Sequence, residues 1–235
     1  YACSFNVVYI VFLRPQSFTV PTLAHDYPEW HRGRTHYALW YVEIQQPELV
    51  EYLNQLRAIF APELFQPNIR QFHITLFVCG FLQKETDNIL SQQKDAEIYN
   101  DDFSIEQFEQ QCRQLKALNL KPFQLQIGKI NSFDSALFVE VLDVENSLSK
   151  IRQAFSKQSH EPAALHYYPH ITLGLYHSEF QAEYLYEKIS QIPQQSFDIE
   201  IEIEIEHLTF GFYQAKVLQG KLYPDQHIQL SSSCE

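Results

Sequence analysis

The sequence has little glycine and little cysteine, and each scarcity excludes a class of protein. Six glycines occur in 235 residues, without a GxGxxG or GxxxxGK[ST] pattern, so a dinucleotide-binding fingerprint and a P-loop are both unsupported. The four cysteines form no CxxC pair and show no metal-like spacing. We therefore expect reduced thiols in a cytoplasmic protein and no disulfide framework.

Basic residues are also scarce. Lys and Arg number 17 against 29 Asp and Glu, which gives a net charge of −12. Binding to long nucleic acid depends on many basic contacts to phosphates, so this balance argues against such a partner. A nucleotide, or an RNA end held at one small site, stays compatible with the charge.

No apolar run is long enough to cross a membrane as a helix. The first apolar stretch ends before Arg14 and Pro15, whereas a spanning helix needs roughly 20 residues. The stretch also lacks the basic leader and small-residue exit of a signal peptide. We expect no membrane association, and the 45% hydrophobic and 20% charged residues indicate a globular chain of one domain or two joined lobes.

One four-letter word occurs twice in the chain. The stretch "FHITLFVCGF" (72–81) contains His-Ile-Thr-Leu from His73, and "PHITLGLY" (169–176) repeats it from His170, 97 residues later. A repeat of this length arises by chance often enough that the word alone is weak. The surroundings of the two copies must decide its meaning.

The two words lie in two similar series of predicted elements. Periodicity predicts strand 36–44, helix 47–60, the His73 strand, helix 104–120 and strand 122–133. It then predicts strand 135–143, helix 145–158, the His170 strand, helix 178–192 and a strand or hairpin over 196–212. The sequence therefore predicts a duplicated unit.

The spacing of the two series supports the duplication. From His73 to Lys129 is 56 residues and from His170 to His207 is 37, a difference of 19. A polar stretch of similar length at 83–102 accounts for this difference as a surface insertion. We expect an N-terminal extension over 1–35, the duplicated domain over 36–223 and a C-terminal tail over 224–235.

Alternation along a strand places histidine and threonine on the same face in both copies. In the first copy the predicted core residues are Phe72, Ile74, Leu76 and Val78, opposite His73, Thr75 and Phe77. In the second copy they are Pro169, Ile171 and Leu173, opposite His166, Tyr168, His170 and Thr172. If the halves pack as a pseudo-twofold pair, the two His-x-Thr faces meet across one groove.

Two histidines that share a phosphate suit one kind of chemistry. Near neutral pH one imidazole can be neutral and accept a proton while the other is charged and donates one. Phosphodiester transfer or hydrolysis needs a base for the attacking oxygen and an acid for the leaving oxygen. The hydroxyls of Thr75 and Thr172 would bind the non-bridging oxygens, and this arrangement requires no metal.

With these two motifs the chain resembles the two-histidine phosphoesterase superfamily, which is marked by two H-x-[ST] motifs on strands. That superfamily includes RNA 2',3'-cyclic phosphodiesterases, also called 2'-5' RNA ligases, and the resemblance covers about 36–213. It implies an α+β fold with two pseudo-twofold-related lobes, each an antiparallel sheet with helices on its outer face. It also implies an active-site groove between the lobes, with His73 and His170 catalytic and no cofactor.

The chain departs from the family pattern after the second motif. "LGLY" stands where many relatives have a basic residue, so an additional phosphate-binding cation is unassigned, and Arg34 and Arg70 are the candidates. Tyr168 and Phe77 could stack on a base, although packing in the core is the alternative for each.

Two further patterns have structural interpretations. His166 and His170 are four residues apart, but Pro169 argues against a helix, and in a strand ~13 Å would separate them, so we do not predict zinc. The alternating Ile-Glu run at 199–206 is predicted to be a half-buried strand with a solvated acidic face.

The predicted function is a metal-independent phosphodiesterase that hydrolyses 2',3'-cyclic phosphate or 2'-5' linked nucleotide or RNA ends. The expected partner is a nucleotide or short oligonucleotide bearing such a phosphate, and we expect a monomer. A non-catalytic nucleotide-binding module and a scaffold that retains only the fold are the alternatives. Which histidine acts as the base, and whether ligation occurs, stay open at this point.

Overall fold

The computed structural model describes residues 12–14, 16–23, 25–83, 99–162, 166–192, 201–217 and 219–230. Within these ranges the chain forms both strands and helices. The strands are β1 (His36–Glu43), β2 (His73–Leu82), β3 (Asp102–Phe103), β4 (Phe123–Ser132), β5 (Ala136–Leu142), β6 (His170–Leu175), β7 (Glu202–Ile205), β8 (His207–Gln214) and β9 (Leu222–Gln229). The helices are α1 (Pro28–His31), α2 (Pro47–Ile59), α3 (Ile105–Ala117), α4 (Ser147–Phe155) and α5 (Ala182–Ser190).

The strands belong to a single curled sheet in the order β7-β4-β5-β6-β2-β1-β8-β9, with β3 paired to β2. Every pair is antiparallel except β2 with β3. Only Glu206 separates β7 from β8, although β7 pairs with β4 and β8 pairs with β1. The sheet must therefore curl to bring its two ends together, and over the described residues 201–212 the strands β7 and β8 do not pair with each other as a hairpin.

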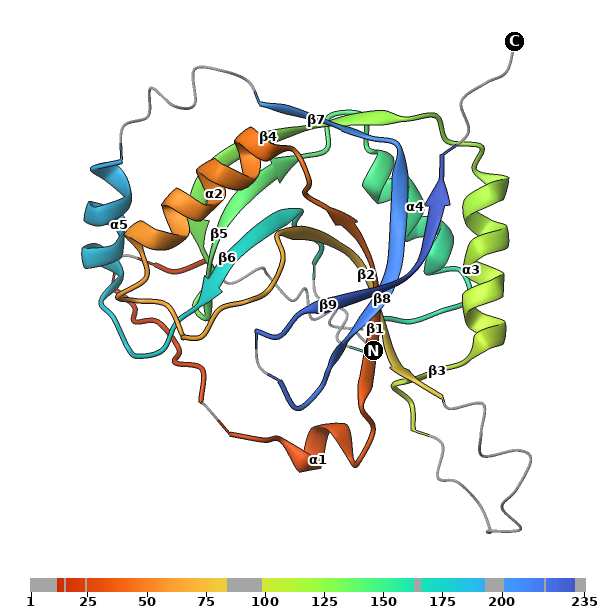
Figure 1. Ribbon diagram of the computed structural model, residues 1–235, viewed down its shortest axis with the longest axis horizontal. Coiled ribbons are helices and arrows are strands. Elements are labelled where there is room, and N and C mark those ends of the chain that lie inside the picture. The colour runs from red at the N-terminus through yellow and green to blue at the C-terminus, as the bar shows by residue number, and fades with distance from the viewer. Residues whose placement is uncertain are drawn as a thin grey trace, which may run out of the picture.

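Helices cover one face of the sheet. Buried residues of α2, α3, α4 and α5 belong to one apolar cluster that also contains Ile74 and Ile171. In Figure 1 α2 and α5 lie toward the left of the view, and α3 and α4 lie toward the right. In α2 the buried stripe is Leu49, Leu53 and Leu56, as the helical period predicts. The predicted α+β fold is confirmed.

The duplication is visible in the topology, with one exchange between the copies. The first copy is β1-α2-β2-α3-β4 and the second is β5-α4-β6-α5-β8. The last strand of each copy pairs with the first strand of the other copy: β4 pairs with β5, and β8 pairs with β1. Each half of the sheet, β4-β5-β6 or β8-β1-β2, thus combines strands from both copies.

The two halves meet at a narrow seam between β2 and β6. One residue pair, Ile74 with Ile171, is in register there, and both side chains are fully buried. By contrast, seven residue pairs join β1 to β2. The relative position of the halves therefore depends on few backbone contacts and on side chains that cross the seam.

Two segments outside the repeat pack on the sheet. In the predicted N-terminal extension, the Leu13 amide donates to Ser132 O (3.1 Å) and the Thr22 amide donates to Tyr176 O (2.7 Å). Residues 224–229 of the predicted C-terminal tail (224–235) belong to β9, which pairs with β8. Asp225, Gln226 and His227 are consecutive polar residues, so this segment gave no alternating signal of a strand.

The acidic run behaves as predicted where the structure describes it. Ile203 and Ile205 are buried, whereas Glu202 and Glu204 are exposed. Residues 199 and 200 lie outside the described residues, as do 84–98 of the predicted insertion. Within the described part of the chain, no helix is both long and apolar enough to cross a membrane.

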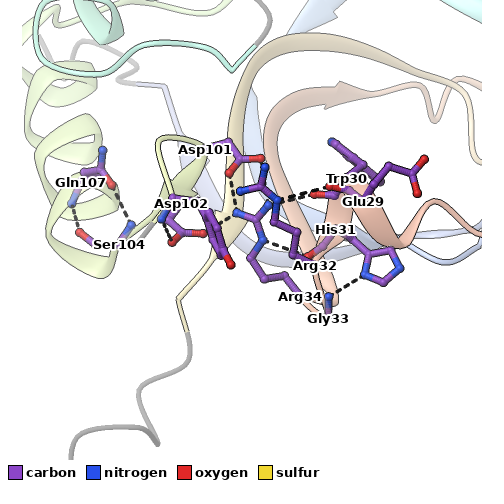
Figure 2. A network of polar contacts seen from close by, with 11 residues as sticks. Glu29, Trp30, His31, Arg32, Gly33, Arg34, Asp101, Asp102, Ser104 and Gln107 are labelled. Atoms are coloured by element: carbon purple, nitrogen blue, oxygen red, sulfur yellow. Dashed lines mark hydrogen bonds and ion pairs between the residues drawn. The ribbon is translucent and has the colours of Figure 1, made fainter. Parts of the chain in front are cut away.

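Arg34 connects the segment before β1 to the last two residues of the predicted insertion, Asp101 and Asp102 (Figure 2). Its guanidinium contacts Asp101 at 2.5 Å and Asp102 at 2.6 Å, and it also donates to Trp30 O at 3.0 Å. It lies over the Phe81 ring at 3.9 Å. Both carboxylates are largely buried, and among the described residues Arg34 is the one cation that forms an ion pair with them.

We predict that Arg34→Met lowers the free energy of unfolding by about 1–3 kcal/mol, because two neighbouring carboxylates lose their cation. Urea denaturation measures the change. Arg32→Met is the matched control, since Arg32 is exposed and forms no ion pair with a carboxylate among the described residues, and we expect about 0.5 kcal/mol or less. Equal stability of Arg34→Met and the unmodified protein would contradict this assignment.

Candidate functional site

The two His-x-Thr motifs stand side by side at the seam. His73 is the first residue of β2 and His170 the first of β6, and the pairing of Ile74 with Ile171 fixes their register. Because the strands are antiparallel, His73 lies beside Thr172, and Thr75 lies beside His170. Both isoleucines point to the helices, so all four motif side chains point to the opposite face.

Both imidazoles are oriented in the same way. His73 Nδ1 is 2.8 Å from Gln71 O, and His170 Nδ1 is 2.7 Å from Tyr168 O. A carbonyl oxygen can only accept, so each Nδ1 carries the proton of its neutral ring. This tautomer leaves Nε2 of each ring as the nitrogen that can exchange a proton with a substrate.

The environment keeps His73 neutral. Burial, with smaller effects of the nearby charges of Arg70, His170 and Arg57, lowers the pKa of His73 to about 3, although the hydrogen bond to Gln71 O acts in the opposite direction. Only 5% of the side-chain surface of His73 is exposed. At neutral pH this imidazole is a proton acceptor.

His170 is less deeply buried than His73. Burial again lowers the pKa of His170, and its hydrogen bond to Tyr168 O opposes that effect. Aromatic edges support the ring, with Phe133 at 5.0 Å and Phe138 at 5.2 Å between centroids. The two histidines therefore share a tautomer and differ in burial and in nearby charge.

The threonine hydroxyls are available to a ligand. Thr75 and Thr172 are half-buried, and in the part of the chain that the structure describes neither hydroxyl has a hydrogen-bond partner. The backbone oxygen of Thr75 accepts a bond from the Tyr167 hydroxyl at 3.2 Å. This contact holds the strand at Thr75 and leaves its side chain free.

Arg70 is a buried cation close to His73. Burial lowers the pKa of Arg70, and its guanidinium lies 4.9 Å from the centre of the Tyr213 ring. Its Nε is buried with no hydrogen-bond partner among the described residues. No carboxylate pairs with it in that part of the chain. An anion beside His73 would satisfy both the charge and the free donor.

Two predicted substrate contacts are not at this site. Arg34 binds Asp101 and Asp102 beyond the start of β1, whereas the far end of β1, Glu43, pairs with His73. Phe77 is fully buried against Phe155 on the helix side. The prediction for both residues is wrong.

A β-bulge explains the error at Phe77. Trp40 pairs with Phe77 and Tyr41 pairs with Thr75, so Leu76 is an extra residue on β2. After an extra residue the alternation shifts by one position, which turns Phe77 into the core. An equivalent bulge occurs in the second copy, where Leu173 is extra between Thr172 and Gly174.

Tyr168 lies beside His170 in an aromatic cluster. Its ring contacts Phe12 at 5.1 Å and Phe138 at 5.9 Å between centroids, and Phe12 also stacks on Phe133 at 5.8 Å. Burial and the hydrogen bond to Glu140 raise the pKa of Tyr168. The partly exposed rings of this cluster form an apolar wall next to the second motif.

A second repeated word was missed by the motif search. Tyr41-Val42-Glu43 on β1 corresponds to Phe138-Val139-Glu140 on β5. In each copy the glutamate pairs with the motif histidine and the aromatic residue pairs with the motif threonine. Comparing the two predicted strands letter by letter would have found this pattern.

Comparison with protein-family models gives one match. The model of the 2'-5' RNA ligase superfamily matches residues 45–216, well over half of the chain. Comparison with curated protein sequences gave no match.

Solved structures with a similar fold include Escherichia coli LigT in complex with 3'-AMP, at 12% identity and a TM-score of 0.52 over 85% of this chain and 100% of that one. A conserved protein of unknown function from Agrobacterium tumefaciens, ATU0111, is 15% identical, with a TM-score of 0.51 over 90% of this chain and 97% of that one. TT0787 of Thermus thermophilus is 12% identical, with a TM-score of 0.50 over 83% and 97%.

We predict that burial of neutral His73 makes the protein acid-sensitive. Its pKa is lower in the folded state than the ordinary value of 6.5, so this contribution to stability is complete above about pH 6.5 and declines as pH falls toward about 3. His73→Gln should reduce the slope of unfolding free energy between pH 6.5 and 5 by up to about 1.4 kcal/mol per pH unit. His166→Gln, at an exposed position, is the control; identical slopes in all three proteins would refute the prediction.

Proposed function

Because the chain belongs to the 2'-5' RNA ligase superfamily of LigT-like phosphoesterases, we propose that it is a metal-independent phosphodiesterase acting on 2',3'-cyclic phosphate or 2'-5' linked nucleotide ends. One observation carries this proposal: the pairing of Ile74 with Ile171 puts both His-x-Thr motifs on one face of adjacent strands. A single phosphate placed there could contact both imidazoles and both hydroxyls.

We assign the base role to His73 and the acid role to His170. Neutral His73 Nε2 accepts a proton from the attacking water as its oxygen bonds to phosphorus. The bond from phosphorus to the leaving ribose oxygen breaks, and protonated His170 gives that oxygen its proton. The lower pKa of His73 and its proximity to Arg70 support this order. Both rings have changed charge at the end of the step, so a proton must return to His170 before the next turnover.

Thr75, Thr172 and Arg70 are assigned to the phosphate. The hydroxyls lie beside the histidine of the opposite motif, so each imidazole would act on a phosphate held by both halves. Arg70 supplies the cation that the sequence after the second motif lacks. Its free Nε supports a bond to a non-bridging oxygen, where negative charge is stabilised during the reaction.

Several features favour a small nucleotide substrate. The net charge of −12 disfavours long RNA, and Glu43 and Glu140 flank the two histidines. The aromatic wall beside His170 offers a surface for a base. Escherichia coli LigT has been crystallised with 3'-AMP, and we expect a mononucleotide or an oligonucleotide end to occupy the corresponding place here.

We predict that His73→Ala and His170→Ala each lower kcat by about 10²–10⁴-fold, because each removes one proton-transfer group. The assay uses a panel of 2',3'-cyclic and 2'-5' linked nucleotides and identifies the phosphate position in the product. His166→Ala, at an exposed histidine four residues before His170, should retain full activity, and chelators should have no effect. Tight nucleotide binding without any product would instead identify a non-catalytic binding module.

We predict an activity optimum on the acid side of pH 6.5. The acid must be protonated, and the pKa of His170 is lowered by burial, so kcat/KM should already decline as pH rises toward 6.5. The base His73 is deprotonated above about pH 3. The decline of kcat/KM at acid pH should therefore occur at a much lower pH than the decline caused by His170. A kcat/KM profile with cyclic nucleotide tests this; a profile still rising between pH 6 and 8 would reverse our assignment.

A further inference from the structure

A third repeated word lies on the helices that cross the seam. Leu56-Arg57-Ala58-Ile59-Phe60 ends α2, and Ile151-Arg152-Gln153-Ala154-Phe155 ends α4. The apolar residues at the first and last positions of both words are buried in the core. The arginine occupies the same position in each, although arginine is among the residues least often found buried.

The two arginines reach the bulges of the opposite copy. Arg57 Nε donates to Leu173 O at 2.9 Å, and Arg152 Nη1 donates to Leu76 O at 2.5 Å. Leu173 and Leu76 are the extra residues that directly follow the motif threonines. A bulge leaves backbone groups without their regular ladder partner, and each guanidinium satisfies one of them.

Arg57 also holds the segment that leads into the first motif. Its Nη1 and Nη2 each donate to Arg70 O at 3.3 Å, and its guanidinium lies 3.9 Å from the centre of the Phe72 ring. No carboxylate pairs with it among the described residues. Arg57 thus links the strand of His170 to the residues immediately before His73.

Arg152 makes the reciprocal link. It pairs with Glu161 through both terminal nitrogens of its guanidinium, Nη1 and Nη2, and Glu161 Oε1 accepts from the Val78 amide at 2.8 Å. The guanidinium lies 3.9 Å from the centre of the Tyr167 ring, whose hydroxyl donates to Thr75 O. Arg152 therefore links the strand of His73 to the segment that leads into His170.

We propose that Arg57 and Arg152 are positioning residues that set the spacing of the two motif strands across the seam. The backbone pairing of β2 with β6 is limited to one registered residue pair, so the side-chain links carry much of this task. Acid–base catalysis by two groups on one phosphorus tolerates little displacement, and about 1 Å can cost about 10²-fold in rate. This inference rests on the proposed function for its kinetic consequence.

The decisive variants are Arg57→Lys and Arg152→Lys. Lysine keeps the positive charge and the aliphatic stem, but it lacks the planar fork that reaches two partners at once. We expect each variant to fold and to lower kcat by about 10–100-fold, with KM within about threefold of the original. Arg113→Lys is the matched control, because the Arg113 side chain is 62% exposed on α3 and, within the described part of the chain, its one carboxylate partner is Glu109; the kcat of this variant should not change.

The outcomes separate geometry from charge. If either lysine variant retains full kcat, the charge alone suffices and the positioning proposal is overturned. If Arg57→Ala and Arg152→Ala unfold, the lysine variants still decide. A loss of kcat that merely follows the folded fraction, measured by circular dichroism, would also overturn the proposal.

A second readout keeps this test independent of turnover. In histidine-selective NMR, the ring nitrogen signals of both His73 and His170 should shift in Arg57→Lys and Arg152→Lys, and stay unchanged in Arg113→Lys. If the unmodified protein turns over no nucleotide, the proposed function fails, whereas these shifts still test the positioning role. Unchanged ring signals in both lysine variants would overturn it.

Discussion

The arrangement of the site follows from one antiparallel contact, that of Ile74 with Ile171. The two strands that carry the motifs run antiparallel there. The histidine of each copy therefore lies beside the threonine of the other copy. Neighbouring strands extend this symmetry. Across the sheet, one row is Glu140, His170, Thr75 and Tyr41, and the other is Glu43, His73, Thr172 and Phe138.

In these two rows, titratable side chains are buried, which costs stability. His73 and Arg70 are held close together, and Arg70 pairs with no carboxylate among the described residues. Burial lowers the pKa values of both groups, and the charge of Arg70 lowers that of His73 further. Such shifts are common where acid–base groups are adjusted for catalysis. The cost is offset by the large apolar cluster on the other face, where the helices of both copies pack against Ile74 and Ile171. One face of these strands therefore contributes to the apolar core, and the other face carries the motif histidines and threonines.

The sequence predicted most of the fold, because duplication and periodicity are local signals. The helices α2, α3, α4 and α5 and the strands of both copies occur close to their predicted ranges. The exchange of β4 and β8 between halves was not predicted, since strand pairing is a long-range property. The bulges at Leu76 and Leu173 reversed the expected face of Phe77, because strict alternation contains no information about an extra residue. Arg34 was misassigned because a basic residue carries no indication of which carboxylates it will meet.

A crystal structure with a bound nucleoside monophosphate would test the central claim most directly. The account predicts that one phosphate contacts Nε2 of His73 and Nε2 of His170 as well as the hydroxyls of Thr75 and Thr172. A phosphate bound by only one motif, or rings turned so that Nδ1 faces the phosphate, would contradict it.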